Sequence, residues 1–133
     1  MSSTIYTKNL SQDKMFGGVD FTPPASYFLA LSTTAISVAG SNVTEPSGNG
    51  YLRSEVPNTK SYLTYSSSGC VVNSGSIVFP TSSGAWGTIV DVAIMSASSS
   101  GSTMFYTTLT TPIVVQTGTS LFFSASALNI KQS

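Results

Sequence analysis

The sequence predicts an all-β fold, an antiparallel β-sandwich of jelly-roll-like form, preceded by a short N-terminal helix or an extended arm. Three observations support this prediction. Hydrophobic residues make up 41% of the 133 residues, which is enough to bury a core. The chain is also rich in Ser and Thr, whose hydroxyl groups favour strands and turns because they compete for backbone hydrogen bonds. Finally, short β-prone segments alternate with Gly, Ser, Asn and Pro at a spacing typical of a sandwich.

The start of the chain is expected to form an arm. Its apolar residues lie near helical spacing, although the Thr and Asn residues among them weaken a helix. Glycines at 17–18 and prolines at 23–24 then end any helix and begin an extended path. We therefore expect an N-terminal arm or short helix over residues 1–25 and a β-sandwich domain over residues 26–133.

The body is expected to consist of short strands. They are predicted near residues 26–32, 51–57, 61–65, 69–73, 76–79, 86–95, 103–109, 113–116 and 120–130. Between the first two, residues 35–50 are rich in glycine and are expected to form a long loop suited to contacts. The alternation of apolar residues shifts in the last strand, which predicts a bulge near Ser126.

The clearest strand, 86–95, is apolar on both faces. The period of two places Thr88, Val90, Val92 and Ile94 on one face and Ile89, Asp91, Ala93 and Met95 on the other. A strand with one face in water would show polar residues at alternate positions. We therefore expect this strand either to be central or to have its second face covered by another subunit. Asp91 is its one charge and a candidate contact residue.

The charge content favours an assembly subunit. Charged residues make up only 8% of the chain, with five Lys or Arg against five Asp or Glu, while a typical soluble domain has about a quarter. A surface of uncharged hydroxyl groups repels neighbouring copies weakly, so close packing of many copies costs little. Because no basic cluster is present, we expect no nucleic-acid partner.

Neither a membrane location nor export is expected. The longest strongly apolar stretch, 89–95, is far shorter than the roughly 20 residues that a membrane helix requires. The first residues lack the basic flank and apolar run of a signal peptide, so we expect synthesis in a cytoplasm without export.

Catalysis is not expected. The chain has no histidine, which removes the commonest general base and metal ligand. Its carboxylates show no motif spacing and no clustering of the kind that binds calcium, so we expect no catalytic, cofactor-binding or metal-binding residues and no cofactor. A glycosidase needs only two facing carboxylates, and that alternative stays open. The single cysteine, Cys70, is expected to be a small core residue.

The aromatic residues leave carbohydrate binding as an alternative. Trp86 is accompanied by six Tyr and seven Phe, and sandwiches often hold sugars with exposed aromatic rings. Aromatic residues are also common in β cores and interfaces. The core interpretation is favoured, because no aromatic pair is flanked by the polar donors that a sugar site also needs.

Segments in a fixed order resemble a family of small tailed-phage structural proteins that are often described as tail-fibre-like. The motifs are Glu-Pro-Ser-Gly-Asn-Gly-Tyr-Leu-Arg at 45–53 and Ile-Val-Phe-Pro at 77–80 followed by Trp-Gly-Thr-Ile at 86–89. The similar segments are residues 16–34, 45–53, 76–80, 84–89, 109–112, 117–123 and 128–130. The N-terminus departs from the family pattern, because it is more polar than the amphipathic helix expected there.

This resemblance implies a β-sandwich protein of the virion with structural motif residues. Pro80 is expected to end a strand, and Gly87 to allow close backbone approach beside Trp86. Arg53 is expected to pair with Glu45 or Glu55 or to anchor the long loop.

We expect a capsid decoration or cement protein, a homotrimer whose partners are the major capsid protein and its own copies. Its expected location is the capsid surface of the virion, in preference to the tail, after synthesis in the host bacterial cytoplasm. The alternative is a tail- or head-fibre module that binds host surface glycans. The candidate contact residues are Ile5, Tyr6, Leu10, Phe16, Phe21 and Asp91.

Overall fold

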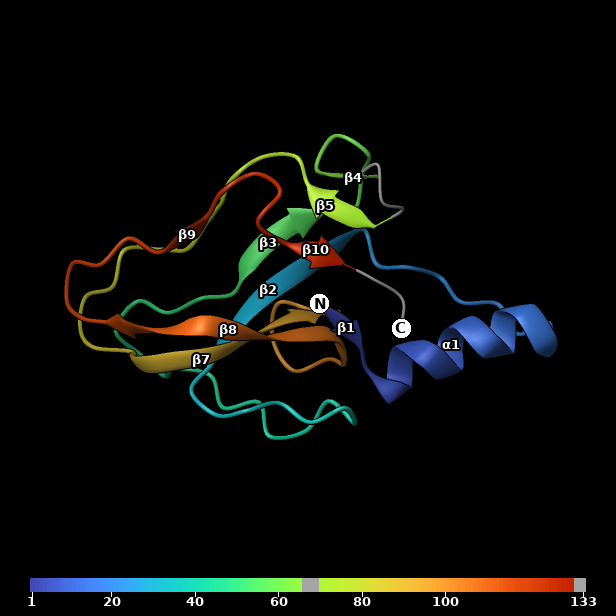
Figure 1. The fold of residues 1–133 in the computed structure, drawn as a ribbon, viewed down its shortest axis with the longest axis horizontal. Helices are drawn as coiled ribbons and strands as arrows, with labels where there is room; N and C mark the ends of the chain where they lie inside the picture. Colours follow the sequence, from blue (N-terminus) through green and yellow to red (C-terminus); the bar gives the residue numbers. More distant parts are fainter. Residues whose placement is uncertain (66–69, 131–133) are drawn as a thin grey trace.

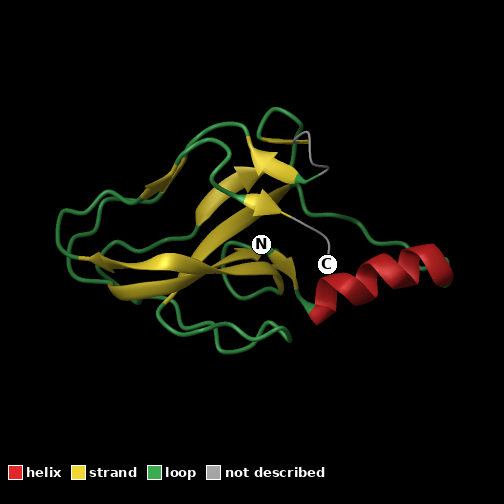
Figure 2. Cartoon of the chain, in the orientation of Figure 1, coloured by secondary structure: helices red, strands yellow, loops and turns green. Residues whose placement is uncertain are grey.

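The computed structural model describes residues 1–65 and 70–130, and it confirms an antiparallel all-β fold with one N-terminal helix (Figures 1 and 2). Residue 69 of the predicted strand 69–73 and residues 131–133 of the predicted domain lie outside the described residues. The elements are β1 (Ser2–Ser3), α1 (Ile5–Phe16), β2 (Ser26–Ser32), β3 (Ser54–Pro57), β4 (Leu63–Tyr65), β5 (Val71–Asn73), β6 (Ile77–Val78), β7 (Gly87–Met95), β8 (Thr103–Val115), β9 (Phe122–Phe123) and β10 (Asn129–Ile130).

The strands form a sandwich of one large sheet against two small ones. The large sheet has the order β1-β8-β7-β2-β3, and the small sheets have the orders β10-β5-β4 and β6-β9. All paired strands run antiparallel. The predicted strands 103–109 and 113–116 are one irregular strand, β8.

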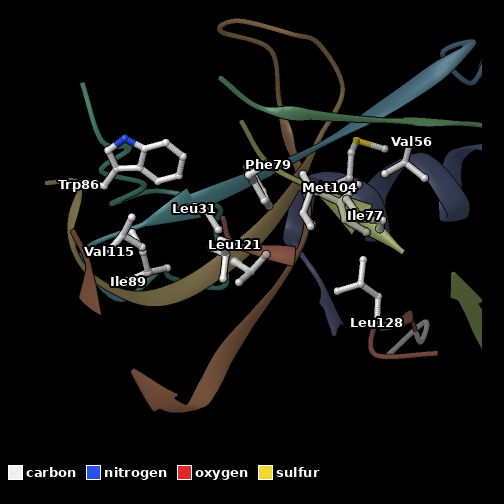
Figure 3. Close-up of a cluster of buried hydrophobic side chains, with 13 residues drawn as sticks. Leu31, Val56, Ile77, Phe79, Trp86, Ile89, Met104, Val115, Leu121 and Leu128 are labelled. Atoms are coloured by element: carbon white, nitrogen blue, oxygen red, sulfur yellow. The ribbon is translucent and has the colours of Figure 1, made fainter. Parts of the chain in front are cut away.

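The main core lies between the large sheet and the two small sheets. Figure 3 shows it running from Trp86 at one end to Val56 and Leu128 at the other. Its buried residues are Leu29, Leu31, Val56, Ile77, Phe79, Trp86, Ile89, Val92, Ile94, Met104, Val115, Leu121 and Leu128. Burial of each large apolar side chain contributes about 1.5–3 kcal/mol, so this core supplies most of the drive to fold.

The faces of β7 differ from the prediction at Ile89. Ile89 packs in the main core with Val92 and Ile94, instead of lying beside Ala93 and Met95. The pairing of β7 with β8 is irregular between Ile89 and Asp91, and such an irregularity changes which side chains share a face.

The second face of β7 is covered by the chain itself. In the second, smaller cluster, Ile36 and Val43 from the loop between β2 and β3 pack against Ala93 and Met95 of β7. This loop passes beneath β7 in Figure 1. Of the two predicted explanations for a doubly apolar strand, the central position is therefore confirmed. A covering subunit is not required, because residues of the long loop do the covering.

The prediction of one strand over 120–130 is wrong. Its first part is β9, which pairs with β6, and its last part is β10, which pairs with β5 in another sheet. Between them the chain turns, with Ser126 at a φ of 64° and Ala127 N–H donating to Ser124 O at 3.0 Å. The shift in alternation thus marks a change of sheet and not a bulge.

The first residues are built into the large sheet. Ser2 and Ser3 pair with Tyr106 and Phe105 of β8, which makes β1 an edge strand. Only after this strand does α1 leave the body, and Figure 1 shows the helix extending away from the sheets. The division of the chain into an arm and a sandwich domain at residue 25 stays a prediction. β1, however, lies within the predicted arm and belongs to the large sheet.

Candidate assembly surface

The base of α1 is fixed to β8 by two threonines. The Thr4 hydroxyl donates to Thr103 O at 2.6 Å and accepts from Thr7 N–H at 3.4 Å, so Thr4 caps the helix and ties it to the sheet. The Thr7 hydroxyl donates to Met104 O at 2.7 Å. Both threonines are buried. The direction in which α1 leaves the body is therefore set by buried hydrogen bonds.

The far end of α1 carries three exposed apolar residues. Met15 is 73% exposed, Phe16 is 83% exposed and Val19, just after the helix, is 56% exposed. We call these three residues the arm tip. Large apolar side chains that gather at an exposed end of a structure commonly mark a site of contact with another molecule.

The arm tip has a defined backbone shape. At the end of the helix, Gly17 N–H donates to Asp13 O at 3.0 Å and Val19 N–H donates to the same carbonyl at 3.1 Å. Gly18 lies between them at a φ of 65°, a left-handed conformation that glycine adopts at low cost. An exposed ion pair between Lys14 and Asp20 joins the helix to the segment that follows.

The sequence-predicted contact residues do not form one surface. Ile5 and Tyr6 are exposed on the first turn of α1, while Phe16 is exposed at the opposite end of the helix. Leu10 and Phe21 are partly buried and pack against the main core. Only Phe16 of the five belongs to the arm tip.

Asp91 lies inside the chain. It is 1% exposed, and its Oδ2 atom accepts a hydrogen bond from Ile36 N–H at 2.8 Å. Its Oδ1 atom has no hydrogen-bond partner among the described residues. A contact residue must reach the surface, so Asp91 is better explained as an anchor that holds the long loop against β7.

A groove opens between the large sheet and the β10-β5-β4 sheet. It encloses about 650 Å³. Its floor is apolar, and its lining includes Tyr27, Val56, Leu63, Ile94, Phe105 and Leu128. Cys70, expected in the core, is half-buried in the wall of this groove. We call it the inter-sheet groove.

A second hollow lies under α1. It encloses about 410 Å³, and Leu10 and Phe21 line it from the arm side. Tyr27 and Phe105 line both this hollow and the inter-sheet groove, so the two adjoin. Burial raises the pKa of the Tyr27 phenol, as expected for a hydroxyl among apolar neighbours. The hollow under α1 and the inter-sheet groove thus form neighbouring apolar surfaces, the first of them beside the arm.

The rim of the groove carries a positive charge. Lys60 Nζ lies 3.7 Å from the centre of the Tyr65 ring, a cation–π contact worth about 0.5–1 kcal/mol at an exposed site. Lys60 forms no ion pair with any residue that the structure describes. Its charge thus lies at the mouth of an apolar groove.

The long loop is held at its end by a charged network of Glu45, Tyr51 and Arg53, which we call the loop staple. Arg53 donates from Nε to Glu45 Oε1 at 2.9 Å and from Nη2 to Glu45 Oε2 at 2.7 Å. The Tyr51 hydroxyl donates to Glu45 Oε1 at 2.6 Å and accepts from Leu31 N–H at 3.1 Å. Arg53 Nη1 also donates to the carbonyls of Ala97 and Ser100, which fixes the turn between β7 and β8.

This network confirms one of the predicted partners of Arg53. The partner is Glu45, whereas Glu55 accepts a hydrogen bond from the Ser26 hydroxyl. Burial alone would raise the pKa of the Glu45 carboxyl, but the hydrogen bonds from Arg53 and Tyr51 outweigh it, and the pKa lies below its ordinary value. The hydrogen bond to Glu45 correspondingly raises the pKa of Arg53.

Acid is expected to weaken the loop staple. Because folding lowers the pKa of Glu45 from its ordinary 4.5, the unfolded chain binds more protons between the two values, and stability falls as the pH drops through this window. Glu45→Gln should cost about 1–2 kcal/mol at pH 6 and less at a second pH well below 4.5, because the wild-type carboxyl progressively loses its charge as the pH falls. Urea unfolding at the two pH values measures this difference. An equal cost at both would contradict the account.

Trp86 is part of the core and not of an exposed sugar platform. It is 5% exposed, its Nε1–H donates to Asn49 O at 2.9 Å, and its ring meets that of Tyr51 edge to face at 5.3 Å. Gly87 follows it at a φ of 89°. A Cβ there would meet only Thr33 Cγ2 at an ordinary 3.6 Å, so glycine serves the backbone conformation and not a close approach.

Pro80 has the expected position. It follows β6 and Phe79, whose N–H donates to Leu121 O at 2.9 Å, and it interrupts the bonding to that segment until Ser82 N–H donates to Thr119 O at 3.0 Å. Because proline has no N–H, it cannot extend the pairing.

Sequence reasoning missed the groove residues. Lys60, Leu63 and Tyr65 lie close together in the chain, and a lysine followed by two tyrosines within five residues was the available signal. Phe105 lies on a distant strand, and no local pattern connects it to them.

Two further properties concern the described residues alone. No helix among residues 1–65 and 70–130 is long and apolar enough to cross a membrane. In the same part of the chain, no three His, Cys, Asp or Glu side chains gather as metal ligands would.

The chain matches a known protein family over almost its whole length. Residues 2–131 match the family described as "Podophage GP4 fiber I protein gp80". No curated protein matches the chain.

Proposed function

Because this chain belongs to the podophage GP4 fiber I protein gp80 family, and is thus a structural protein of a phage virion, we propose that it is a fibre subunit that works through protein–protein contacts. The observation that carries this proposal is the arm tip, where an ordered helix end presents Met15 and Phe16 to solvent. A chain that acted alone would gain from burying these side chains, while a subunit needs them for contact.

We propose that the chain has no catalytic activity. Four of its five carboxylates already have structural partners or are buried. Glu45 is held by Arg53, Asp20 pairs with Lys14, Glu55 binds Ser26 and Asp91 lies under the long loop. These roles leave few groups for acid–base work, and they favour the structural interpretation over the glycosidase alternative.

The capsid-surface decoration expected from the sequence is the second candidate. A decoration protein needs a compact body and a projecting contact element, and the sandwich with its arm has this form (Figure 2). The family description names a fibre, which favours the fibre proposal, but a fibre can stand on a head or on a tail. The partner in the decoration case is the major capsid protein.

The host-glycan alternative loses its main candidate. Trp86 is buried, so its ring cannot stack on a sugar. Exposed aromatic rings remain at Tyr62 and Tyr65. Saturable binding on a glycan array that is lost in Tyr62→Ala would favour glycan recognition.

Imaging of purified particles tests the proposal. Particles made with and without this chain are compared by cryo-electron microscopy, and their protein content is measured. We expect the chain in wild-type particles and a fibre missing from the deficient ones. Loss of density from the capsid face between capsomers would support decoration, and absence of the chain from purified particles would contradict both.

A further inference from the structure

We propose that the arm tip of one copy binds in the inter-sheet groove of a second copy, so that the chain assembles head to tail. The proposed function makes the arm tip a contact surface, and this inference names its partner. The inference therefore rests on the proposed function. The two surfaces match in polarity, since both are apolar. One is a convex apolar end of a helix, and the other is an apolar groove of about 650 Å³.

The charges beside the two surfaces are opposite. Asp13 lies one helical turn before Phe16, so the two share a face of α1. Neither Asp13 nor Lys60 forms an ion pair with a described residue, since Lys14 is the partner of Asp20 and Arg53 that of Glu45. An arm tip that enters the groove past its rim brings Asp13 towards Lys60. The second copy is thus favoured over an uncharged apolar ligand.

The arm tip cannot bind in the inter-sheet groove of its own chain. Thr4 and Thr7 bind β8 and set the direction of α1, which extends away from the sheets in Figure 1. A helix of 12 residues is about 18 Å long and does not fold back on itself. The hollow under α1 is lined by residues of the helix up to Met15, while Phe16 does not line it and is exposed to solvent.

Contact between two different surfaces has a defined consequence for assembly. Each copy binds one neighbour through its arm tip and another through its groove. Such heterologous contacts add further copies unless the rotation between neighbours brings the last copy back to the first. A closed arrangement gives a ring, which includes the expected homotrimer, and an open one gives a filament. Either outcome suits a virion fibre.

Sedimentation velocity over a range of concentrations tests the contact. We expect the wild-type chain to associate with increasing concentration and Phe16→Asp to weaken the association at least about tenfold, because a charge cannot enter an apolar groove. Phe122→Asp is the matched control. Phe122 is also exposed, at 58%, and lies on β9 at the opposite end of the molecule from the arm tip (Figure 1).

A charge exchange tests the pairing without touching the core. Asp13→Lys and Lys60→Glu should each weaken association, and the double variant should restore it. Both residues are exposed, so the folded body is retained, and lysine near the end of a helix is favourable. If both single variants associate like the wild type, the proposed pairing is wrong.

Mixing distinguishes head-to-tail contact from a symmetric one. Phe16→Asp keeps its groove and Lys60→Glu keeps its arm tip, so an equimolar mixture should form heterodimers more strongly than either variant alone self-associates. A mixture no stronger than its components would overturn the proposal, as would a wild-type chain that stays monomeric at every concentration. Chains that fail to associate but are found in virions would refute this inference and leave the proposed function standing.

Discussion

Replacing Trp86 with alanine is expected to lower the free energy of unfolding by about 3–5 kcal/mol. The side chain fills one end of the main core (Figure 3), where it packs with Ile89 and Val115 and meets the Tyr51 ring edge to face. The substitution leaves a large cavity, and the surrounding strands can relax only partly. A domain with a typical stability of about 5–15 kcal/mol would lose a large share of it.

Urea unfolding followed by far-ultraviolet circular dichroism measures this loss. Trp86 is the only tryptophan, so its fluorescence cannot report on the variant. Trp86→Phe is the control. It keeps one aromatic ring and loses the rest of the indole, including the N–H that donates to Asn49 O, a carbonyl that still accepts from Ser83 N–H at 3.0 Å. We expect it to cost about 1–2 kcal/mol. If Trp86→Ala were as stable as Trp86→Phe, the ring would not be a core element.

Removing Arg53 is expected to cost about 2–3 kcal/mol. Arg53→Ala loses two hydrogen bonds to Glu45 and two to the turn between β7 and β8, and it leaves a partly buried carboxylate with only Tyr51 as a partner. Arg53→Lys should recover little, because a lysine cannot make the bidentate contact. The Arg53 side chain is only 7% exposed, so solvent does not compensate.

The Lys14–Asp20 pair provides the matched control. Its side chains are 62% and 85% exposed, and Lys14→Ala should change stability by less than about 1 kcal/mol. In a double-mutant cycle, Arg53→Ala combined with Glu45→Gln should cost less than the sum of the single changes, because the double variant leaves no unpaired charge. Strict additivity would show that the two residues act independently.

The fold class and most strands could be predicted from the sequence, because both depend on local patterns. The period of two in β7 and the glycines and prolines that bound the other strands are visible in the chain itself. The pairing of Arg53 with Glu45 was also among the predictions, since the two lie at either end of one glycine-rich turn.

Features set by distant contacts could not be predicted. The sequence suggested that Asp91 was a contact residue at the surface. The loop that covers it, which contains Ile36, is distant in the sequence and approaches Asp91 only in the folded chain. The segment 120–130 alternates like a strand, but its two ends pair with different sheets. The inter-sheet groove combines residues of the large sheet with those of β4 and β5, so no stretch of sequence contains it.

Cross-linking between copies tests the head-to-tail contact most directly, because the chain already carries its one cysteine, Cys70, in the wall of the inter-sheet groove. Val19→Cys adds a thiol to the arm tip and keeps Phe16. After treatment with a short thiol-specific cross-linker, we predict that peptide mapping finds residue 19 of one copy joined to Cys70 of another. Phe122→Cys, at the far end of the molecule, should give no such link. Products joined only through residue 19 to residue 19, or no intermolecular products, would contradict the account.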